Sequence, residues 1–103
     1  MANSCINMLY CRTDNAESYQ TILDFLNDNF SVDSISEDED NLFLECDFSF
    51  RWTFPQKEME QLSQTLKADQ SLYIRCLSYK FGCDYVDYLI YKEGQWQSRI
   101  IND

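Results

Sequence analysis

The chain has 103 residues, of which 45% are hydrophobic and 16% aromatic, and a formal net charge of −10. This length predicts one domain over residues 1–103, and the apolar content is high enough for folding rather than disorder. No apolar run approaches the roughly 20 residues that a membrane helix needs, and the start lacks the pattern of a signal peptide. We therefore expect a cytoplasmic protein of a host cell.

The charge is unevenly distributed along the chain. Residues 1–50 contain eleven Asp and Glu residues but one basic residue, Arg12, whereas residues 51–103 contain seven of each sign. An acidic field of this kind repels nucleic acid and membrane surfaces and attracts basic proteins. The composition thus favours a basic protein partner, with no direct nucleic-acid or membrane binding.

The first half of the chain predicts a strand, a helix and a hairpin. Ser4–Arg12 is apolar enough for a central strand. Asp14 and Glu17 are spaced as a capping pair, and apolar residues at helical spacing then predict a helix over 15–29. A short strand is expected at 30–36, followed by an exposed acidic hairpin tip at 37–40.

Residues 41–54 carry the clearest pattern, because apolar and polar side chains alternate as in a strand with one buried face. Pro55 ends this strand and suits the first turn of a helix over 55–67. Strands follow at 71–81 and 84–92, joined by a tight turn at 82–83. A turn at Glu93 and Gly94 leads to a short edge strand at 95–101.

This order of elements predicts an α+β fold. It matches the split β-α-β arrangement of ferredoxin-like domains, an antiparallel sheet with both helices on one face, extended by a C-terminal hairpin.

The five cysteines do not form a metal or disulfide motif. Their number is odd, no Cys-x-x-Cys pair is present, and the chain has no histidine. We interpret them as small buried hydrophobic residues and expect no metal and no cofactor.

Several short motifs of the sequence resemble those of a known protein family. Residues 3–9, Asn-Ser-Cys-Ile-Asn-Met-Leu, resemble the Asn-x-Cys-x-Asn-x-Leu start of the YubB-type ferredoxin-like proteins of plasmids and phages. The aromatic strand ending in Trp and Pro at 50–55, the Gly-containing hairpin at 79–82 and the Tyr-x-x-Gly turn at 91–94 are also similar. Ser4 departs from the family, which has Trp there, and the middle of the chain is shorter and more acidic. The resemblance implies a ferredoxin-like fold and a mobile-element origin, and it supplies no catalytic residue.

Acidic residues form the first candidate binding site. An extended strand places Glu45 and Asp47 about 7 Å apart, a spacing close to that of successive phosphates along a DNA strand. Carboxylates in this array could occupy the basic groove of a nuclease, and the alternative is a solvated, solubilising loop. Calcium binding is disfavoured because neither the alternating ligands nor the turn glycine is present. The candidate acids are Asp33, Glu37, Asp38, Glu39, Asp40, Glu45 and Asp47.

Aromatic residues on the polar faces of the strands form the second candidate site. Mixed with both charge signs, they fit a protein interface better than a base-stacking surface. The alternative is that the rings cover a second small core or a dimer contact. The candidates are Phe43, Tyr73 and Tyr79, together with Tyr85 and Tyr88.

These features predict a non-enzyme, because without histidine general acid–base work would fall to a carboxylate, Tyr, Lys or Cys, and neither Cys76 nor Cys83 has an evident base beside it. The leading hypothesis is an inhibitor of a basic, nucleic-acid-handling host protein, such as a CRISPR effector or restriction nuclease, by charge and shape mimicry of DNA. The alternative is a homodimeric structural or accessory protein that pairs through its aromatic sheet face. A third hypothesis, a single-stranded nucleic-acid binder, is disfavoured by the net charge.

Overall fold

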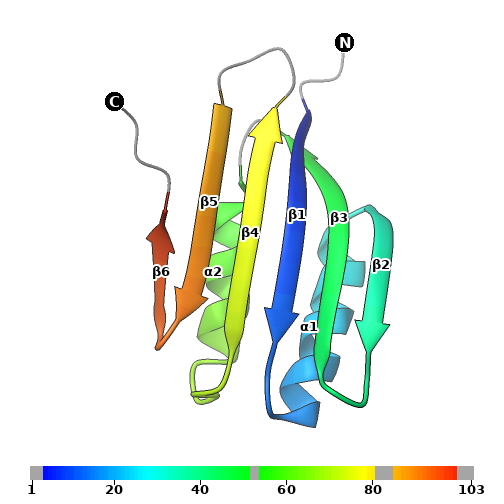
Figure 1. Ribbon diagram of the computed structural model, residues 1–103, viewed down its shortest axis with the longest axis vertical. Helices are drawn as coiled ribbons and strands as arrows, with labels where there is room; N and C mark the ends of the chain where they lie inside the picture. The colour runs from blue at the N-terminus through cyan, green and yellow to red at the C-terminus, as the bar shows by residue number, and fades with distance from the viewer. Residues whose placement is uncertain (1–3, 52–53, 81–84, 100–103) are drawn as a thin grey trace.

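The computed structural model describes residues 4–51, 54–80 and 85–99 of the chain, and within them it has two helices and six strands (Figure 1). The helices are α1 (Ala16–Asn29) and α2 (Gln56–Thr65). The strands are β1 (Ser4–Arg12), β2 (Val32–Asp38), β3 (Phe43–Arg51), β4 (Tyr73–Lys80), β5 (Tyr85–Lys92) and β6 (Gln95–Ser98).

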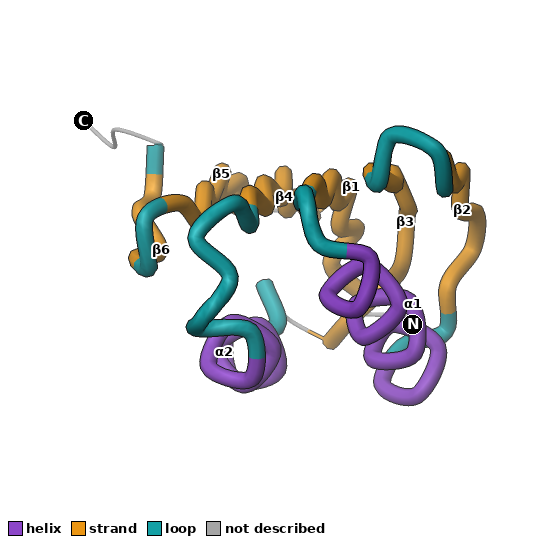
Figure 2. The backbone as a smooth tube through the Cα atoms, turned by 90° about the horizontal axis from the view of Figure 1, so that it is seen from below, coloured by secondary structure: helices purple, strands orange, loops and turns teal. Residues whose placement is uncertain are grey.

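All six strands form one antiparallel sheet in the order β2-β3-β1-β4-β5-β6. Both helices lie on the same side of this sheet, and the β2–β3 end curves around α1 (Figure 2). The predicted α+β class, the antiparallel sheet, the helices on one face and the C-terminal hairpin of β5 and β6 are therefore confirmed.

The hydrophobic core fills the space between the sheet and the helices. The predicted alternation in the long strand is confirmed at Leu44, Cys46 and Phe48, which are buried. Phe30, just after α1, stacks on Phe48 with ring centroids 4.3 Å apart. Burial of these rings, together with the apolar side chains of both helices and the other strands, drives folding at about 25 cal/mol per Å² of apolar surface.

The start of α1 differs from the prediction. Asn15, rather than Asp14, caps the helix, and its side-chain oxygen accepts hydrogen bonds from the N–H groups of Glu17 (2.8 Å) and Ser18 (3.1 Å). The prediction chose the wrong residue because Asp and Asn are equally good caps and they are adjacent here.

The acidic hairpin also differs from the prediction. Glu37 and Asp38 belong to β2, and the turn comprises residues 39–42, where Leu42 has a positive φ of 56°.

The long strand is shorter than predicted, and Phe54 lies outside it. The predicted positions of Trp52, the 82–83 turn and the end of the last strand lie outside the described residues.

The turn between β5 and β6 is confirmed. Glu93 and Gly94 both have positive φ, 53° and 80°, as a two-residue turn that matches the twist of its strands requires.

Across the described part of the chain, neither helix has the length and apolar character needed to cross a membrane.

Candidate binding surface

The side of the sheet opposite the helices has no element covering it among the described residues (Figure 2). We call it the open face. Strand alternation and the cross-strand register assign residues to it, because directly paired residues share a face. Its members on the four central strands include Ile6, Met8, Tyr10, Arg12, Phe43, Glu45, Asp47, Ser49, Tyr73, Arg75, Leu77, Tyr79, Val86, Tyr88, Ile90 and Lys92.

Aromatic rings and arginines gather at one end of the open face. The Tyr10 ring lies 6.0 Å from the Phe43 ring and 6.1 Å from the Tyr73 ring, measured between centroids. The Arg75 guanidinium lies 4.2 Å from the Tyr10 centroid, and that of Arg12 lies 5.0 Å from the Tyr73 centroid. Cation–π contacts of this kind hold the cations over the rings, so the cluster offers a preorganised contact surface.

Sequence reasoning included Phe43 and Tyr73 in this cluster but missed Tyr10 and Arg12. Both missed residues alternate with buried Leu9 and Cys11 along β1. That alternation is visible in the sequence, but Ile6 and Met8 make both faces of β1 largely apolar and hide it.

Two other predicted aromatics lie elsewhere. Tyr79 is on the open face, but at the end near Ile6 and Val86. Tyr85 is on the helix side, where its hydroxyl oxygen accepts a hydrogen bond from the N–H of Phe54 (3.1 Å). The prediction of Tyr85 as a face residue was wrong, because an alternating strand puts Tyr85 and Tyr88 on opposite sides.

Four of the seven candidate acids lie along the β2–β3 half of the open face. Glu45 is exposed there, and Asp47 accepts a hydrogen bond from the Ser34 hydroxyl (3.2 Å). Asp33, at the bulge in β2, accepts one from the Ser49 hydroxyl (3.5 Å). The fourth is Asp38, which pairs in register with Phe43.

The other three acids do not join this group. Glu37 pairs with buried Leu44, so it belongs to the helix side of the sheet edge. Glu39 and Asp40 are exposed in the turn. Asp38 itself has a local role, because hydrogen bonds from the side chain and backbone N–H of Asn41 lower the pKa of its carboxyl.

A hollow of about 200 Å³ lies where the acidic half meets the aromatic cluster, since Tyr10 and Glu45 both line it. Its lining includes Glu45 and Asp47 from β3 and Arg75 from β4, with Met8 and Leu77 among the apolar residues between them. Met8 is 47% exposed. Apolar groups surrounded by charged ones resemble the centre and rim of protein–protein interfaces.

The four described cysteines, Cys5, Cys11, Cys46 and Cys76, are buried and unpaired, as predicted; Cys83 lies outside the described residues. Burial raises the pKa of Cys46 and that of Cys76 to about 12. Burial also raises the pKa of Cys11, further raised by the nearby thiols. Since the thiolate is the nucleophile and the metal ligand, these side chains function as core residues. Among the described residues, no group of His, Cys, Asp and Glu is arranged to hold a metal ion.

Comparison with known protein families, with curated protein sequences and with solved structures finds no match. The resemblance to YubB-type proteins therefore stays a prediction, and the open face must be interpreted from its own chemistry.

Proposed function

We propose that this chain is a non-enzymatic binding protein whose open face engages a basic protein. The observation that carries the proposal is that four carboxylates lie along the β2–β3 half of the open face and that two of them, Glu45 and Asp47, line one hollow with Tyr10 of the aromatic cluster. The carboxylates supply long-range attraction to a basic surface, and the rings supply the desolvated centre of the contact.

The partner class follows from the charge array. Glu45 and Asp47 are two residues apart on one face of a strand, so Lys and Arg side chains that normally hold successive phosphates can engage both. A nucleic-acid-handling protein of a host, such as a CRISPR effector or restriction nuclease, presents such side chains. Inhibition would then follow from occupation of its nucleic-acid groove.

We further propose that the fold is a ferredoxin-like split β-α-β domain. What supports this is the position of β1, which lies between β3 and β4 although β2 comes next along the chain. β5 and β6 would be an extension of that core at its β4 edge.

A charge-matched pair of variants tests the binding proposal. Glu45→Gln with Asp47→Asn neutralises two open-face acids, and Asp24→Asn with Asp28→Asn neutralises two exposed acids of α1. Capture of a basic protein from host lysate, quantified by mass spectrometry, should fall at least about tenfold with the first variant. It should be nearly unchanged with the second, and higher salt should weaken capture by the wild type. Equal capture by both variants would refute the role of the open face.

The alternative, a homodimer through the open face, is favoured by one observation. Met8 and Val86 are large apolar residues on this face that are 47% and 46% exposed. If two copies pair here, Met8→Glu should convert a dimer to a monomer in light scattering.

A further inference from the structure

The two edges of the sheet differ in their protection against pairing. Edge strand β2 contains a bulge between Val32 and Ser34 and carries Asp33, Glu37 and Asp38. Charges and bulges on an edge strand prevent another strand from pairing with it. The other edge strand, β6 (Gln95–Ser98), is uncharged and keeps a regular register with β5.

The hydrogen-bond pattern shows which groups of β6 are exposed at the edge. The N–H of Arg99 donates to the carbonyl of Tyr88 (2.7 Å), so Arg99 points its backbone groups toward β5. Backbone direction alternates along an antiparallel strand. Gln97 therefore also faces β5, whereas the N–H and C=O groups of Trp96 and Ser98 point outward, where no strand of the described chain lies.

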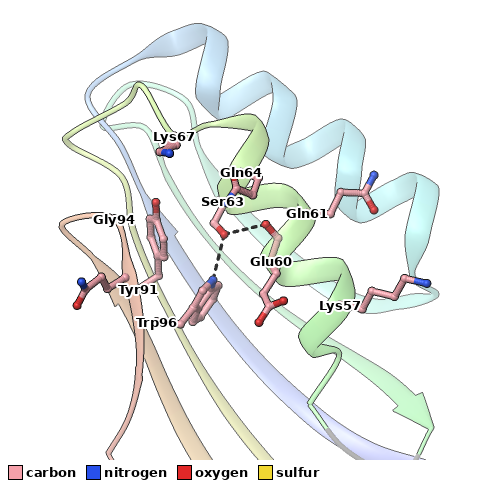
Figure 3. Close-up of a pocket in the computed structure, with 10 residues that line it drawn as sticks. Lys57, Glu60, Gln61, Ser63, Gln64, Lys67, Tyr91, Gly94 and Trp96 are labelled. Carbon is pink, nitrogen blue, oxygen red and sulfur yellow. Dashed lines mark hydrogen bonds between the residues drawn. The ribbon is translucent and has the colours of Figure 1, made fainter.

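Side-chain contacts hold this edge in place (Figure 3). The indole N–H of Trp96 donates to the Ser63 hydroxyl of α2 (3.1 Å), and that hydroxyl donates to the Glu60 carbonyl (2.9 Å). The Trp96 ring packs on Phe54 and Tyr91, with centroids 5.5 and 5.3 Å away. The edge is thus preorganised, which lowers the entropic cost of pairing.

We propose that β6 pairs antiparallel with β6 of a second copy, joining the two sheets into one. With Gln97 facing its own equivalent across the two-fold axis, Trp96 of each copy exchanges both backbone hydrogen bonds with Ser98 of the other. Gln95 then lies opposite Arg99 of the second copy, and no like charges meet in the strand pair. The groove of about 690 Å³ between α2 and β6 runs beside the new contact.

Charge explains why the occupant is a second copy. Residues 1–50 hold all of the net charge of −10, and their strands β2 and β3 lie at the opposite end of the sheet from β6 (Figure 1). Two copies that meet at β6 keep these acidic regions as far apart as the sheet allows. Pairing through the β2 edge would instead bring them together.

Two charge variants at one residue test this proposal, which does not depend on the proposed function. In the dimer, Gln97→Lys and Gln97→Glu each place like charges opposite one another, and such pairs are destabilising. Both variants should raise the dimer dissociation constant, measured by analytical ultracentrifugation, about fivefold or more. If the partner is a different, charged protein, the two variants should change the affinity in opposite directions, and that outcome would overturn the proposal.

A backbone variant gives a second test. Ser98→Pro removes an outward N–H but leaves the β5–β6 hydrogen bonds intact, and Ser98→Ala removes only the hydroxyl that donates to Asp87 (2.7 Å). Ser98→Pro removes two hydrogen bonds per dimer, so its dimer dissociation constant should be about tenfold or more above that of the wild type. The dissociation constant of Ser98→Ala should stay near the wild-type value. Circular dichroism checks that both variants fold. If Ser98→Pro does not fold, the two Gln97 variants provide the test of the β6 contact. A wild-type monomer at millimolar concentration, or a dimer abolished by Met8→Glu and insensitive to Gln97, would refute the β6 contact.

Discussion

At the scale of single residues, a partly buried polar cluster joins two loops that are distant in sequence. The Asp69 carboxylate accepts hydrogen bonds from the hydroxyls of Thr13 and Ser71 and from the Ser71 N–H (3.0 Å). Thr13 is 1% exposed and follows β1, whereas Asp69 and Ser71 precede β4. The cluster thus ties the start of α1 to the start of β4.

This cluster predicts a pH-dependent contribution to stability. Partial burial of Asp69 alone would raise its pKa, but the hydrogen bonds from Ser71, Thr13 and Ser18 together outweigh it and lower the pKa. A lowered native pKa stabilises the fold above the unfolded-state value near 4 and loses that effect as the pH falls through the native value. Asp69→Asn should therefore lower the free energy of unfolding by about 1–2 kcal/mol at pH 7.

Urea denaturation of the wild type and Asp69→Asn at neutral and acidic pH measures this effect. The difference between the two proteins should shrink below the unfolded-state pKa of about 4. A difference that is equally large at acidic pH would mean that the carboxylate charge contributes nothing and that packing alone is disturbed.

At the scale of elements, the cap of α1 gives the clearest comparison between neighbouring residues. Asn15→Ala removes the acceptor for two backbone N–H groups of the first turn and should cost about 1 kcal/mol of stability. Asp14→Ala keeps the Asp14 N–H that donates to the Ser71 hydroxyl (2.8 Å), so its cost should be smaller. Thermal or urea unfolding of both variants checks this order, and a larger loss for Asp14→Ala would contradict the assigned cap.

Most elements could be predicted from the sequence, because alternation and helical spacing report directly on burial. β1 has the predicted limits, and both helices lie within the predicted ranges. The acidic hairpin was harder. Four adjacent carboxylates suggest a loop, but Glu37 and Asp38 pair with Leu44 and Phe43 of β3, and this cross-strand pairing overrides local preference.

At the scale of the whole molecule, the sequence pattern could not predict the register in which β1 pairs with β3 and β4, strands that no short turn joins to it. The Tyr10 cluster depends on both pairings, since Arg12 pairs with Phe43 on β3 and with Tyr73 on β4. The number of residues between these positions says nothing about that proximity. The acidic half was more accessible to prediction, because its residues come from two strands joined by a short turn.

The position of the acidic β2–β3 region at the end of the sheet opposite β6 also links the two proposals. If β6 pairs with a second copy, the dimer carries one acidic β2–β3 region at each end. A partner with two basic sites could then be held by both ends, provided that its geometry matches the span, and the second contact would form at a high effective concentration.

The uneven distribution of charge between the two edges of the sheet predicts that one substitution can change stability and binding in opposite directions. Glu39, in the β2–β3 turn, lies among like charges, whereas Glu93, in the β5–β6 turn, follows Lys92. Both are exposed turn residues, so Glu39→Lys and Glu93→Lys make the same charge change at opposite edges of the sheet. Only the first relieves repulsion between carboxylates, so only Glu39→Lys should raise the urea midpoint at low salt.

This gain should fade as the ionic strength rises toward about 0.15 M, where the screening length is about 8 Å. In the capture experiment Glu39→Lys should act in the opposite direction, because a reversed charge next to the open-face acids weakens the long-range attraction of the basic partner even though Glu39 itself lies in the turn. A variant that is more stable but binds less well is expected where acidic residues are kept for recognition at a cost in stability. If Glu39→Lys and Glu93→Lys change stability and capture alike, the acidic region is a solubilising surface rather than a binding site.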